Sequence, residues 1–264
     1  MIGRYKKTIV TLFKILHEAK KEPFENIQKW LTLQEALINK LIYIENRIRF
    51  CKKEIKEINK YRKDANKRLA KEESQKLKSN LKTLKYKIED YRWIILILKS
   101  IGDGIAFTFI HKFDIKPQKF KESTGFISEK KGLVLEKKIL RYSFKRGIVA
   151  ILNDLTSVLK YADITLLTDD GILPIEAKSS EVHNAKTIRQ IKKINKLYKY
   201  LKEDVTSNLY GDGAEVMRRV EIVNPEINYI ETFNGLLSSA EKEGIDYSKF
   251  RELTILNLKK DYYA

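Results

Sequence analysis

The chain has little cysteine, proline and glycine: its 264 residues include one cysteine, four prolines and eleven glycines. The single cysteine, Cys51, has no partner for an internal disulfide, which excludes the small secreted folds that depend on several disulfides. The N-terminus has no run of small and apolar residues resembling a cleaved signal. We therefore expect the reducing cytoplasm to be its location.

Long apolar runs and metal-binding motifs are also missing. The longest apolar stretch, Trp93 to Ile110, is interrupted by Lys99, Asp103 and two glycines. Because a membrane span needs about 20 predominantly apolar residues, we expect a buried helix here and no membrane association. The three histidines have no ligand spacing and no Cys–His cluster exists, which excludes a zinc site. No phosphate-binding glycine loop indicates a nucleotide-driven motor.

What the chain has in excess is positive charge. It carries 53 Lys and Arg against 35 Asp and Glu, a net charge of +18, and residues 1 to 100 hold +14 of it, with 26 basic residues against 12 acidic ones. A basic surface attracts polyanions such as nucleic acid. The alternative is a biased genome composition, since Lys outnumbers Arg 41 to 12.

Two runs of apolar residues in the first 100 residues have heptad spacing. The first contains Leu37, Leu41, Ile44, Ile48, Cys51, Ile55 and Ile58, and the second contains Leu77, Leu81, Leu84, Ile88, Tyr91, Ile95 and Leu98. The second run is displaced by one residue in phase, and residues 71–75 between the two are polar. We predict an antiparallel helical hairpin over residues 33–100 and a helix from about Tyr5 to Lys21 before it. One continuous helix that pairs two copies of the chain is the alternative.

Beyond residue 95 the pattern changes to short runs rich in Ile, Val and Leu between helical segments. The predicted elements are a helix over residues 129–145, strands at 148–152, 162–167 and 172–175, a helix over 188–201, a strand at 219–223, a helix over 229–243 and a strand at 253–256. This order predicts a mixed α/β fold. We predict two domains: a basic helical, coiled-coil region over 1–94 and an α/β domain over 95–264.

The second and third predicted strands carry the candidate chemistry. An Asp-Gly step ending at Gly171 favours a tight hairpin turn. If Thr168 and Gly171 flank a two-residue turn, Asp163 and Glu176 lie opposite each other and can share one divalent cation. Lys178 stands two residues after Glu176 and therefore points to the same face.

These residue types suit hydrolysis of a phosphodiester. Carboxylate oxygens bind magnesium or manganese, which retain waters that can attack phosphorus. The amine of Lys178 can orient or deprotonate the attacking water, or stabilise negative charge in the transition state, and the three roles stay open. The alternative is a cross-strand salt bridge on the surface, formed by Asp163, Glu176 and Lys178.

Asp163, the twelve residues after it and the triplet Glu176-Ala177-Lys178 resemble the motif of the PD-(D/E)xK, or restriction-endonuclease-like, nuclease superfamily. The order of helix, three strands, helix and strand resembles the family core as well, over roughly residues 95 to 224. The resemblance implies a mixed sheet flanked by helices. It also implies that Asp163 and Glu176 bind magnesium, that Ala177 contributes its carbonyl, and that Lys178 assists hydrolysis.

Other family positions have counterparts here. Gln190 stands where many members carry a polar residue on the next helix, whereas Ile194 replaces the tyrosine that accompanies it in one branch, and Ala162 replaces the proline of the nominal motif. Members often add an acidic residue from an earlier helix. Asp103 is the first candidate for this metal ligand, since burial of an unpaired carboxylate is costly, and Glu136 is the alternative. A helix cap or an ion pair with a nearby lysine suits Asp103 equally, and a solvated position suits Gln190 equally.

The segment Asn153-Asp154-Leu155-Thr156 precedes the Asp163 strand. Asp154 either approaches the same cleft or caps a turn locally. The sequence therefore leaves open whether a further carboxylate joins Asp163.

Together these features predict a magnesium- or manganese-dependent nuclease. DNA is favoured over RNA because the family usually cleaves DNA and no aromatic motif of an RNA-binding module occurs. The resemblance suggests a role in bacterial genome defence. The N-terminal helices would contact the phosphate backbone, a second subunit or a protein partner. The competing class is a non-catalytic nucleic-acid-binding or scaffolding protein with a degenerate nuclease fold, and the third is a coiled-coil adaptor with an unrelated α/β domain.

Overall fold

The computed structural model describes residues 2–63, 70–115, 125–169, 171–178, 185–209, 216–220, 229–243, 245–250 and 253–258. The chain forms two compact units, Met1–Arg219 and Val220–Ala264. In the described part of the chain, no helix combines the length and the apolar character that a membrane crossing requires.

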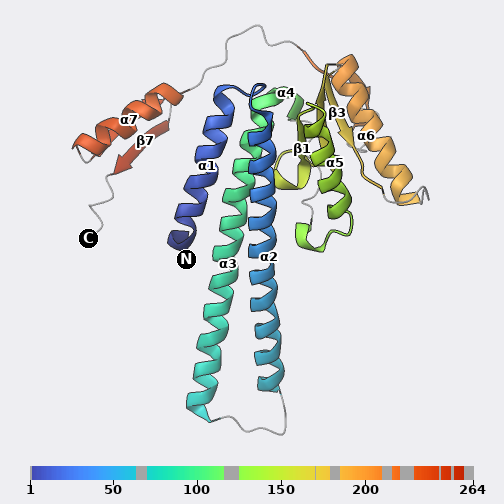
Figure 1. The fold of residues 1–264 in the computed structure, drawn as a ribbon. Coiled ribbons are helices and arrows are strands. Elements are labelled where there is room, and N and C mark those ends of the chain that lie inside the picture. Colours follow the sequence, from blue (N-terminus) through green and yellow to red (C-terminus); the bar gives the residue numbers. More distant parts are fainter. Residues whose placement is uncertain are drawn as a thin grey trace. The chain divides into compact units, whose positions relative to one another are not determined.

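Long helices make up the N-terminal half of the first unit (Figure 1). They are α1 (Lys6–Lys21), α2 (Ile27–Lys63) and α3 (Lys71–Phe109). Arg47 on α2 donates to Tyr91 on α3, and Tyr61, further along α2, donates to Glu73 near the start of α3. The two helices therefore run antiparallel. The predicted antiparallel hairpin is thus confirmed, and the single continuous helix is not formed.

The heptad seam forms the interface between the two long helices. Its α2 members Leu37, Leu41, Ile44, Ile48 and Cys51 are at most 2% exposed, and its α3 members Leu84, Ile88, Tyr91 and Leu98 are buried as well. Towards the tip, Ile55 and Ile58 are only partly buried. The seam therefore holds the hairpin together most strongly at the end where α1 also packs.

A small antiparallel sheet lies beside this hairpin. It contains β1 (Ala150–Leu152), β2 (Ile164–Thr168) and β3 (Gly171–Ile175), in the order β1-β2-β3. Helix α5 (Leu133–Lys145) packs against β1 and β2, and α6 (Ala185–Glu203) packs against β3. The mixed α/β character predicted for this part is confirmed.

Shorter elements complete the first unit. They are the 3-10 helices η1 (Ile2–Tyr5), η3 (Ile127–Glu129) and η4 (Asn153–Leu155), helix α4 (Lys112–Ile115), and the strand pair β4 (Val205–Ser207) and β5 (Val216–Arg218). The strand predicted at 219–223 is shifted: β5 ends at Arg218, and residues 221–223 lie outside the described residues. Strand β5 pairs only with β4, which the sequence did not predict, so among the described residues it forms a separate sheet.

The second unit contains one helix and one hairpin. These are α7 (Ile230–Glu243), β6 (Ile245–Phe250) and β7 (Leu253–Leu258), with β6 and β7 antiparallel. The sequence predicted α7 and β7 but not β6. The residues Ile245, Tyr247 and Phe250 are neither contiguous nor strictly alternating, so neither strand pattern marks this segment.

The predicted boundary at residues 94 and 95 falls inside α3, which is continuous from Lys71 to Phe109. Residues from both sides of it share one core, including Trp30, Ile94, Ile105, Phe144 and Ile151. The helical hairpin and the sheet therefore fold as one unit.

A buried glutamine attaches the sheet to the hairpin. Gln34 on α2 is fully buried; its Nε2 donates to the Ala150 carbonyl at 2.8 Å, and its Oε1 accepts from the Leu152 N–H at 2.9 Å. The side-chain amide thus pairs with the free edge of β1 as a neighbouring strand would. This contact satisfies two backbone groups that are otherwise cut off from water.

Two glycines permit close packing on α3. A Cβ at position 102 would overlap the backbone carbonyl of Leu155 in η4, and one at 104 would lie 2.7 Å from Leu16 Cδ2 of α1. Gly102 and Gly104 therefore explain how η4 and α1 approach the α3 backbone, although glycine is a weak helix former.

We expect Gln34→Leu to lower the free energy of unfolding by about 2–4 kcal/mol, because two buried backbone groups lose their partner. Urea denaturation followed by circular dichroism measures the change. Asn39→Ala, at an exposed position on the same helix, is the control and should change stability by less than about 0.5 kcal/mol. Equal stability of the two variants would contradict the role given to Gln34.

We expect Gly102→Ala to lower stability by about 1–3 kcal/mol, because the methyl group must displace the backbone of η4. Gly125→Ala is the control, since a Cβ there meets nothing within 4 Å. Thermal unfolding of both variants gives the comparison, and an unchanged midpoint for Gly102→Ala would show that the contact with Leu155 is not tight.

Candidate active site

The β2–β3 hairpin brings Asp163 and Glu176 to the same end of the sheet. Thr168 pairs with Gly171 and Ile164 pairs with Ile175, so the predicted register is confirmed as far as this last pair. Asp163 and Glu176 are the next residues on the two sides. The Asp163 N–H donates to the Ile175 carbonyl at 2.9 Å, one residue out of the strand register, which holds Asp163 against the end of β3.

The chain enters this position through a strained turn. Ala162 has a φ of 67°, in the left-handed region that residues with a Cβ rarely adopt. Buried Asn153 holds the turn: its Nδ2 donates to the Tyr161 carbonyl at 2.6 Å, and its Oδ1 accepts from Thr165 Oγ1 at 2.8 Å. Proline, whose ring fixes φ near −65°, would not fit this dihedral.

Asp163 is one of three carboxylates that surround one lysine. Lys130 Nζ is 2.7 Å from Asp163 Oδ1, 2.8 Å from Asp154 Oδ2 and 3.0 Å from Glu136 Oε1. Glu136 is 1% exposed, and Asp154 and Asp163 are also buried. The acidic residues come from α5, η4 and the residue before β2, so the cluster joins three separate elements.

Burial and charge shift the protonation of this cluster. Burial raises the pKa of Glu136 to about 7; Lys130 opposes the shift, and the nearby carboxylates of Asp163 and Asp154 add to it. Burial alone would lower the pKa of Lys130, but Asp154 and Asp163 outweigh it and raise the pKa above its ordinary value. Lys130 therefore stays charged. Burial lowers the pKa of Lys99 on α3, and the attraction of Asp154 offsets this only in part.

Glu136 keeps one oxygen without a partner. Its Oε2 is buried and accepts no hydrogen bond from any residue that the structure describes. Its Oε1 lies so close to Gly132 that a Cβ there would come within 2.9 Å. The cluster is thus tightly packed but its hydrogen bonding is incomplete.

Lys178 forms the other half of the site. Its Nζ lies 2.7 Å from Glu176 Oε1 and donates to Gln190 Oε1 on α6 at 3.3 Å. The Ala177 N–H donates to Asp163 Oδ2 at 2.9 Å, which ties the triplet to the aspartate. The structure therefore brings together Asp163, Glu176, Lys178 and Gln190, and the contact seen for Ala177 is made by its N–H.

Asp103, the first candidate for the extra metal ligand, lies elsewhere. It accepts hydrogen bonds from the backbone N–H of Ser157, at 2.7 Å, and from the Ser157 hydroxyl. The close approach at Gly102 explains this, since it places the next residue of α3 against the turn after η4. Glu136, the alternative candidate, lies in the same cluster as Asp163, and so does Asp154.

Lys130 was not predicted. In a chain so rich in lysine, no local pattern distinguishes Lys130 from Lys131 beside it. The three carboxylates were visible in the sequence, each on a separate element. The position of the Lys130 amine between them depends on how η3 packs on α2. Glu45 fixes that position by accepting the backbone N–H groups of Ile127 at 3.0 Å and Ser128 at 2.8 Å.

A basic pocket adjoins Glu176. It has a volume of about 220 Å³ and is lined by Tyr161, Ala162, Glu176, Arg189, Gln190, Lys193 and Ile194. Arg189 and Lys193 lie one helical turn apart on α6, so both can face one anionic group. The pocket thus combines a carboxylate at its edge with two cations.

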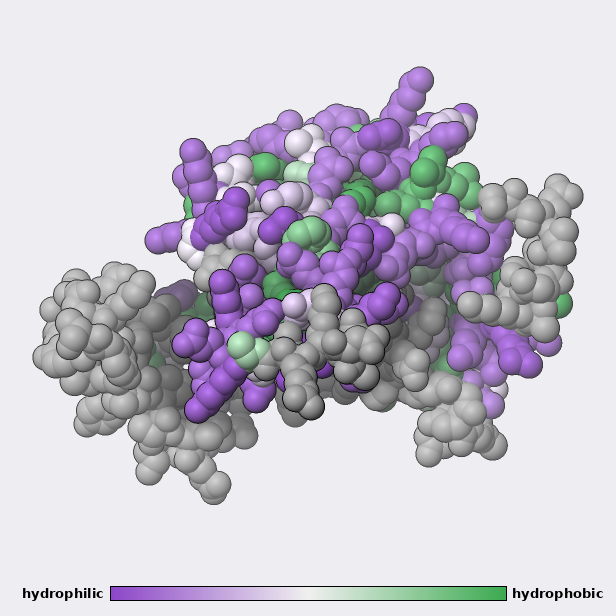
Figure 2. Space-filling view, turned by 90° about the horizontal axis from the view of Figure 1, so that it is seen from below, coloured by the Kyte–Doolittle hydropathy of each residue, from purple (hydrophilic) through white to green (hydrophobic). Residues whose placement is uncertain are grey.

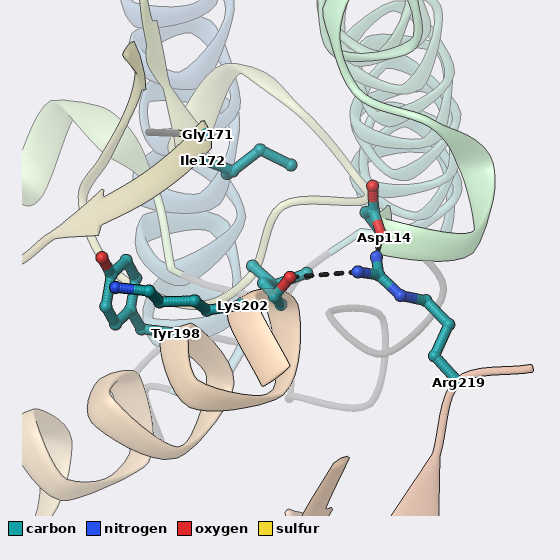
Figure 3. A pocket seen from close by; sticks show the side chains of 7 residues that line it. Asp114, Gly171, Ile172, Tyr198, Lys202 and Arg219 are labelled. Carbon is teal, nitrogen blue, oxygen red and sulfur yellow. Dashed lines mark hydrogen bonds and ion pairs between the residues drawn. The ribbon is translucent and has the colours of Figure 1, made fainter. Parts of the chain in front are cut away.

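A second pocket, of about 270 Å³, contains none of the predicted site residues. Figure 3 shows the Arg219 guanidinium directed at Asp114 on α4. Arg219 also pairs with Asp204 and donates to the Leu201 carbonyl at 3.0 Å. Because this arginine is used to join α4, α6 and β5, the pocket is explained by packing between elements.

The carboxylates fit a hard divalent cation in type but not in their present arrangement. Among the residues that the structure describes, no group of three or more His, Cys, Asp or Glu side chains is arranged to hold a metal ion. Lys130 lies between the oxygens of Glu136, Asp154 and Asp163. Buried carboxylate oxygens, one of them unpartnered, are nevertheless the ligands that magnesium and manganese take.

No protein-family model, curated protein or solved structure matches this chain.

The raised pKa of Glu136 predicts a pH-dependent stability. The unfolded side chain ionises near 4.5 and the folded one near 7, so the chain should lose stability relative to Glu136→Gln as pH rises between these values. The change is on the order of 3 kcal/mol. Thermal unfolding of both proteins with a chelator, from pH 4 to 8, measures it.

Glu129→Gln is the matched control, at an exposed carboxylate of η3, and should leave the pH profile unchanged. A difference between Glu136→Gln and the unsubstituted chain that stays constant from pH 4 to 8 would refute the assignment of the raised pKa.

Proposed function

We propose that this chain is a divalent-metal-dependent nuclease with a restriction-endonuclease-like core, and that its substrate is DNA. The observation that supports this best is the placement of Asp163 beside the Glu176-Ala177-Lys178 triplet at the end of one hairpin. The Ala177 N–H donates to Asp163, and Lys178 is bound to both Glu176 and Gln190. A surface salt bridge alone would not require two further buried carboxylates beside Asp163.

Asp163 and Glu176, with Glu136 or Asp154 beside them, are the residues that would hold magnesium or manganese. The bound cation would polarise a phosphate oxygen and lower the pKa of a bound water. Lys178 Nζ, held by Glu176 and Gln190, is positioned to orient the attacking water or to stabilise charge on phosphorus.

Arg189 and Lys193 would bind the substrate backbone. Both line the pocket beside Glu176, and phosphate groups are the anions that such paired cations bind in nucleic acid. The phosphate next to the cleaved bond would thus lie against α6, and the cleaved phosphate would lie beside the Glu176–Lys178 pair.

The helical hairpin supplies a further basic surface. The face seen from below is mainly hydrophilic (Figure 2), and most of the excess positive charge of the chain lies in residues 1 to 100. Exposed aromatic rings lie among the lysines, with Lys82 Nζ 5.7 Å from the centre of the Tyr86 ring. These features support contact with a nucleic-acid backbone outside the active site.

Lys130 supports one competing function. Its ammonium already balances part of the charge of Glu136, Asp154 and Asp163. A nucleic-acid-binding protein with a degenerate nuclease fold would use such a lysine permanently in place of a metal. Retention of Lys178 and its contacts with Glu176 and Gln190 favours the enzyme, because a non-catalytic protein has no need of them.

The test is incubation of the purified chain with plasmid, linear DNA and RNA, with magnesium or with a chelator. We expect magnesium-dependent cleavage of DNA, abolished by the chelator. Lys178→Ala should lower the rate by about 10²-fold or more, because the group that acts on the water or the phosphate is lost.

Lys138→Ala, at an exposed lysine of α5, is the matched control and should cleave like the unsubstituted chain. Cleavage that persists with both the chelator and Lys178→Ala would come from another mechanism or a contaminant. Absence of cleavage on all three substrates would favour the non-catalytic reading.

A further inference from the structure

We infer that Lys130 is a tethered counter-cation, which occupies the carboxylate cluster in the metal-free protein and competes with the divalent ion for it. The inference rests on the proposed function, because the cluster contains Asp163, Glu136 and Asp154, which are among the residues proposed to hold the metal. It adds a residue that sets the concentration of divalent ion at which the site is occupied by metal.

The first argument is that the ammonium and a divalent ion would use the same carboxylate oxygens. Lys130 Nζ has three protons and lies within 3.0 Å of three carboxylate oxygens, one each from Glu136, Asp154 and Asp163. Carboxylate oxygens that converge on one point are also the ligands of a hard divalent ion. A metal cannot bind all three oxygens while the ammonium lies between them, so the two are mutually exclusive.

The second argument is that lysine satisfies the cluster only in part. Glu136 is 1% exposed, yet its Oε2 has no hydrogen-bond partner among the described residues. The ammonium contributes one positive charge to three acidic groups, and a divalent ion would contribute two. The buried, unpartnered oxygen therefore points to a ligand with more charge and more coordination positions than an ammonium group has.

The third argument is that Lys130 can leave without unfolding. It lies in the short segment between η3 and α5, and its side chain is 29% exposed. Glu45 holds the backbone of Ile127 and Ser128 on α2, so the segment stays in place while the side chain rotates. Because part of the side chain already reaches solvent, the ammonium can move outward when a divalent ion takes its place.

Two consequences follow. The metal-free protein is protected from repulsion among buried carboxylates, because the lysine separates them. Metal binding must displace an existing ion pair, so the affinity for metal is lower than the ligands alone would give. Lys130 thus sets a threshold of divalent-ion concentration, below which the lysine and not the metal occupies the carboxylate cluster.

The test compares Lys130→Met with the unsubstituted chain in binding of Mn²⁺, measured from the free-ion signal by electron paramagnetic resonance without nucleic acid. We expect Lys130→Met to bind Mn²⁺ at least about tenfold more tightly. In chelator its melting temperature should fall below that of the unsubstituted chain, and Mn²⁺ should restore it. Lys131→Met, at the exposed neighbouring lysine, is the control and should bind like the unsubstituted chain.

Loss of folding in Lys130→Met would not end the test. The same comparison is made between Asp154→Asn and Asp154→Asn/Lys130→Met, in which one carboxylate fewer needs a counter-charge. The double variant should again bind Mn²⁺ about tenfold more tightly than Asp154→Asn alone.

The outcomes separate this inference from the nuclease proposal. Equal Mn²⁺ affinity with and without Lys130 overturns the tethered counter-cation, whereas metal-dependent cleavage would still support the nuclease. Tight binding by Lys130→Met without cleavage of any substrate supports the counter-cation and overturns the nuclease. Absence of Mn²⁺ binding in every variant overturns both.

Discussion

Ionised carboxylates that are buried side by side repel one another unless a cation lies between them. In this protein Glu136, Asp154 and Asp163 meet at one point, and the ammonium of Lys130 is 2.7 to 3.0 Å from an oxygen of each. Each acidic residue belongs to a different element, so this one interaction joins α5, η4 and the start of β2. The arrangement of the sheet relative to its first helix depends on it.

The helical hairpin is the support on which this cluster is assembled. Gln34 pairs with the edge of β1, Glu45 holds the η3 backbone, and Gly102 lets η4 approach α3. These contacts come from α2 and α3, the same helices that carry the basic outer surface. A nucleic acid bound along the hairpin would therefore lie on the element that positions Lys130 and Asp154, which links binding to the geometry of the site.

The proposed chemistry depends on two neighbouring sets of charges with different roles. Lys178, Glu176 and Gln190 form a partly exposed set at the rim, suited to contact with water and phosphate. The Lys130 cluster is the buried set, suited to hold a cation. Asp163 belongs to both, since its Oδ1 faces Lys130 and its Oδ2 accepts the N–H of Ala177. Because the two oxygens of one side chain connect the sets, a change of cation in the cluster would act directly on the Glu176-Ala177-Lys178 triplet.

Local patterns in the sequence determined the helices of the hairpin, the two-residue turn and the end of the β2–β3 hairpin at which Asp163 and Glu176 lie. Heptad spacing and strand pairing next to a tight turn involve residues close in the chain, so their geometry follows from periodicity. The partners of Asp103, Lys130 and Gln34 were decided only by the tertiary structure. Gln34 contacts a carbonyl 116 residues away, and Lys130 contacts carboxylates 24 and 33 residues away. Such contacts depend on how whole elements pack, and no short-range pattern records which of many similar lysines or carboxylates will meet.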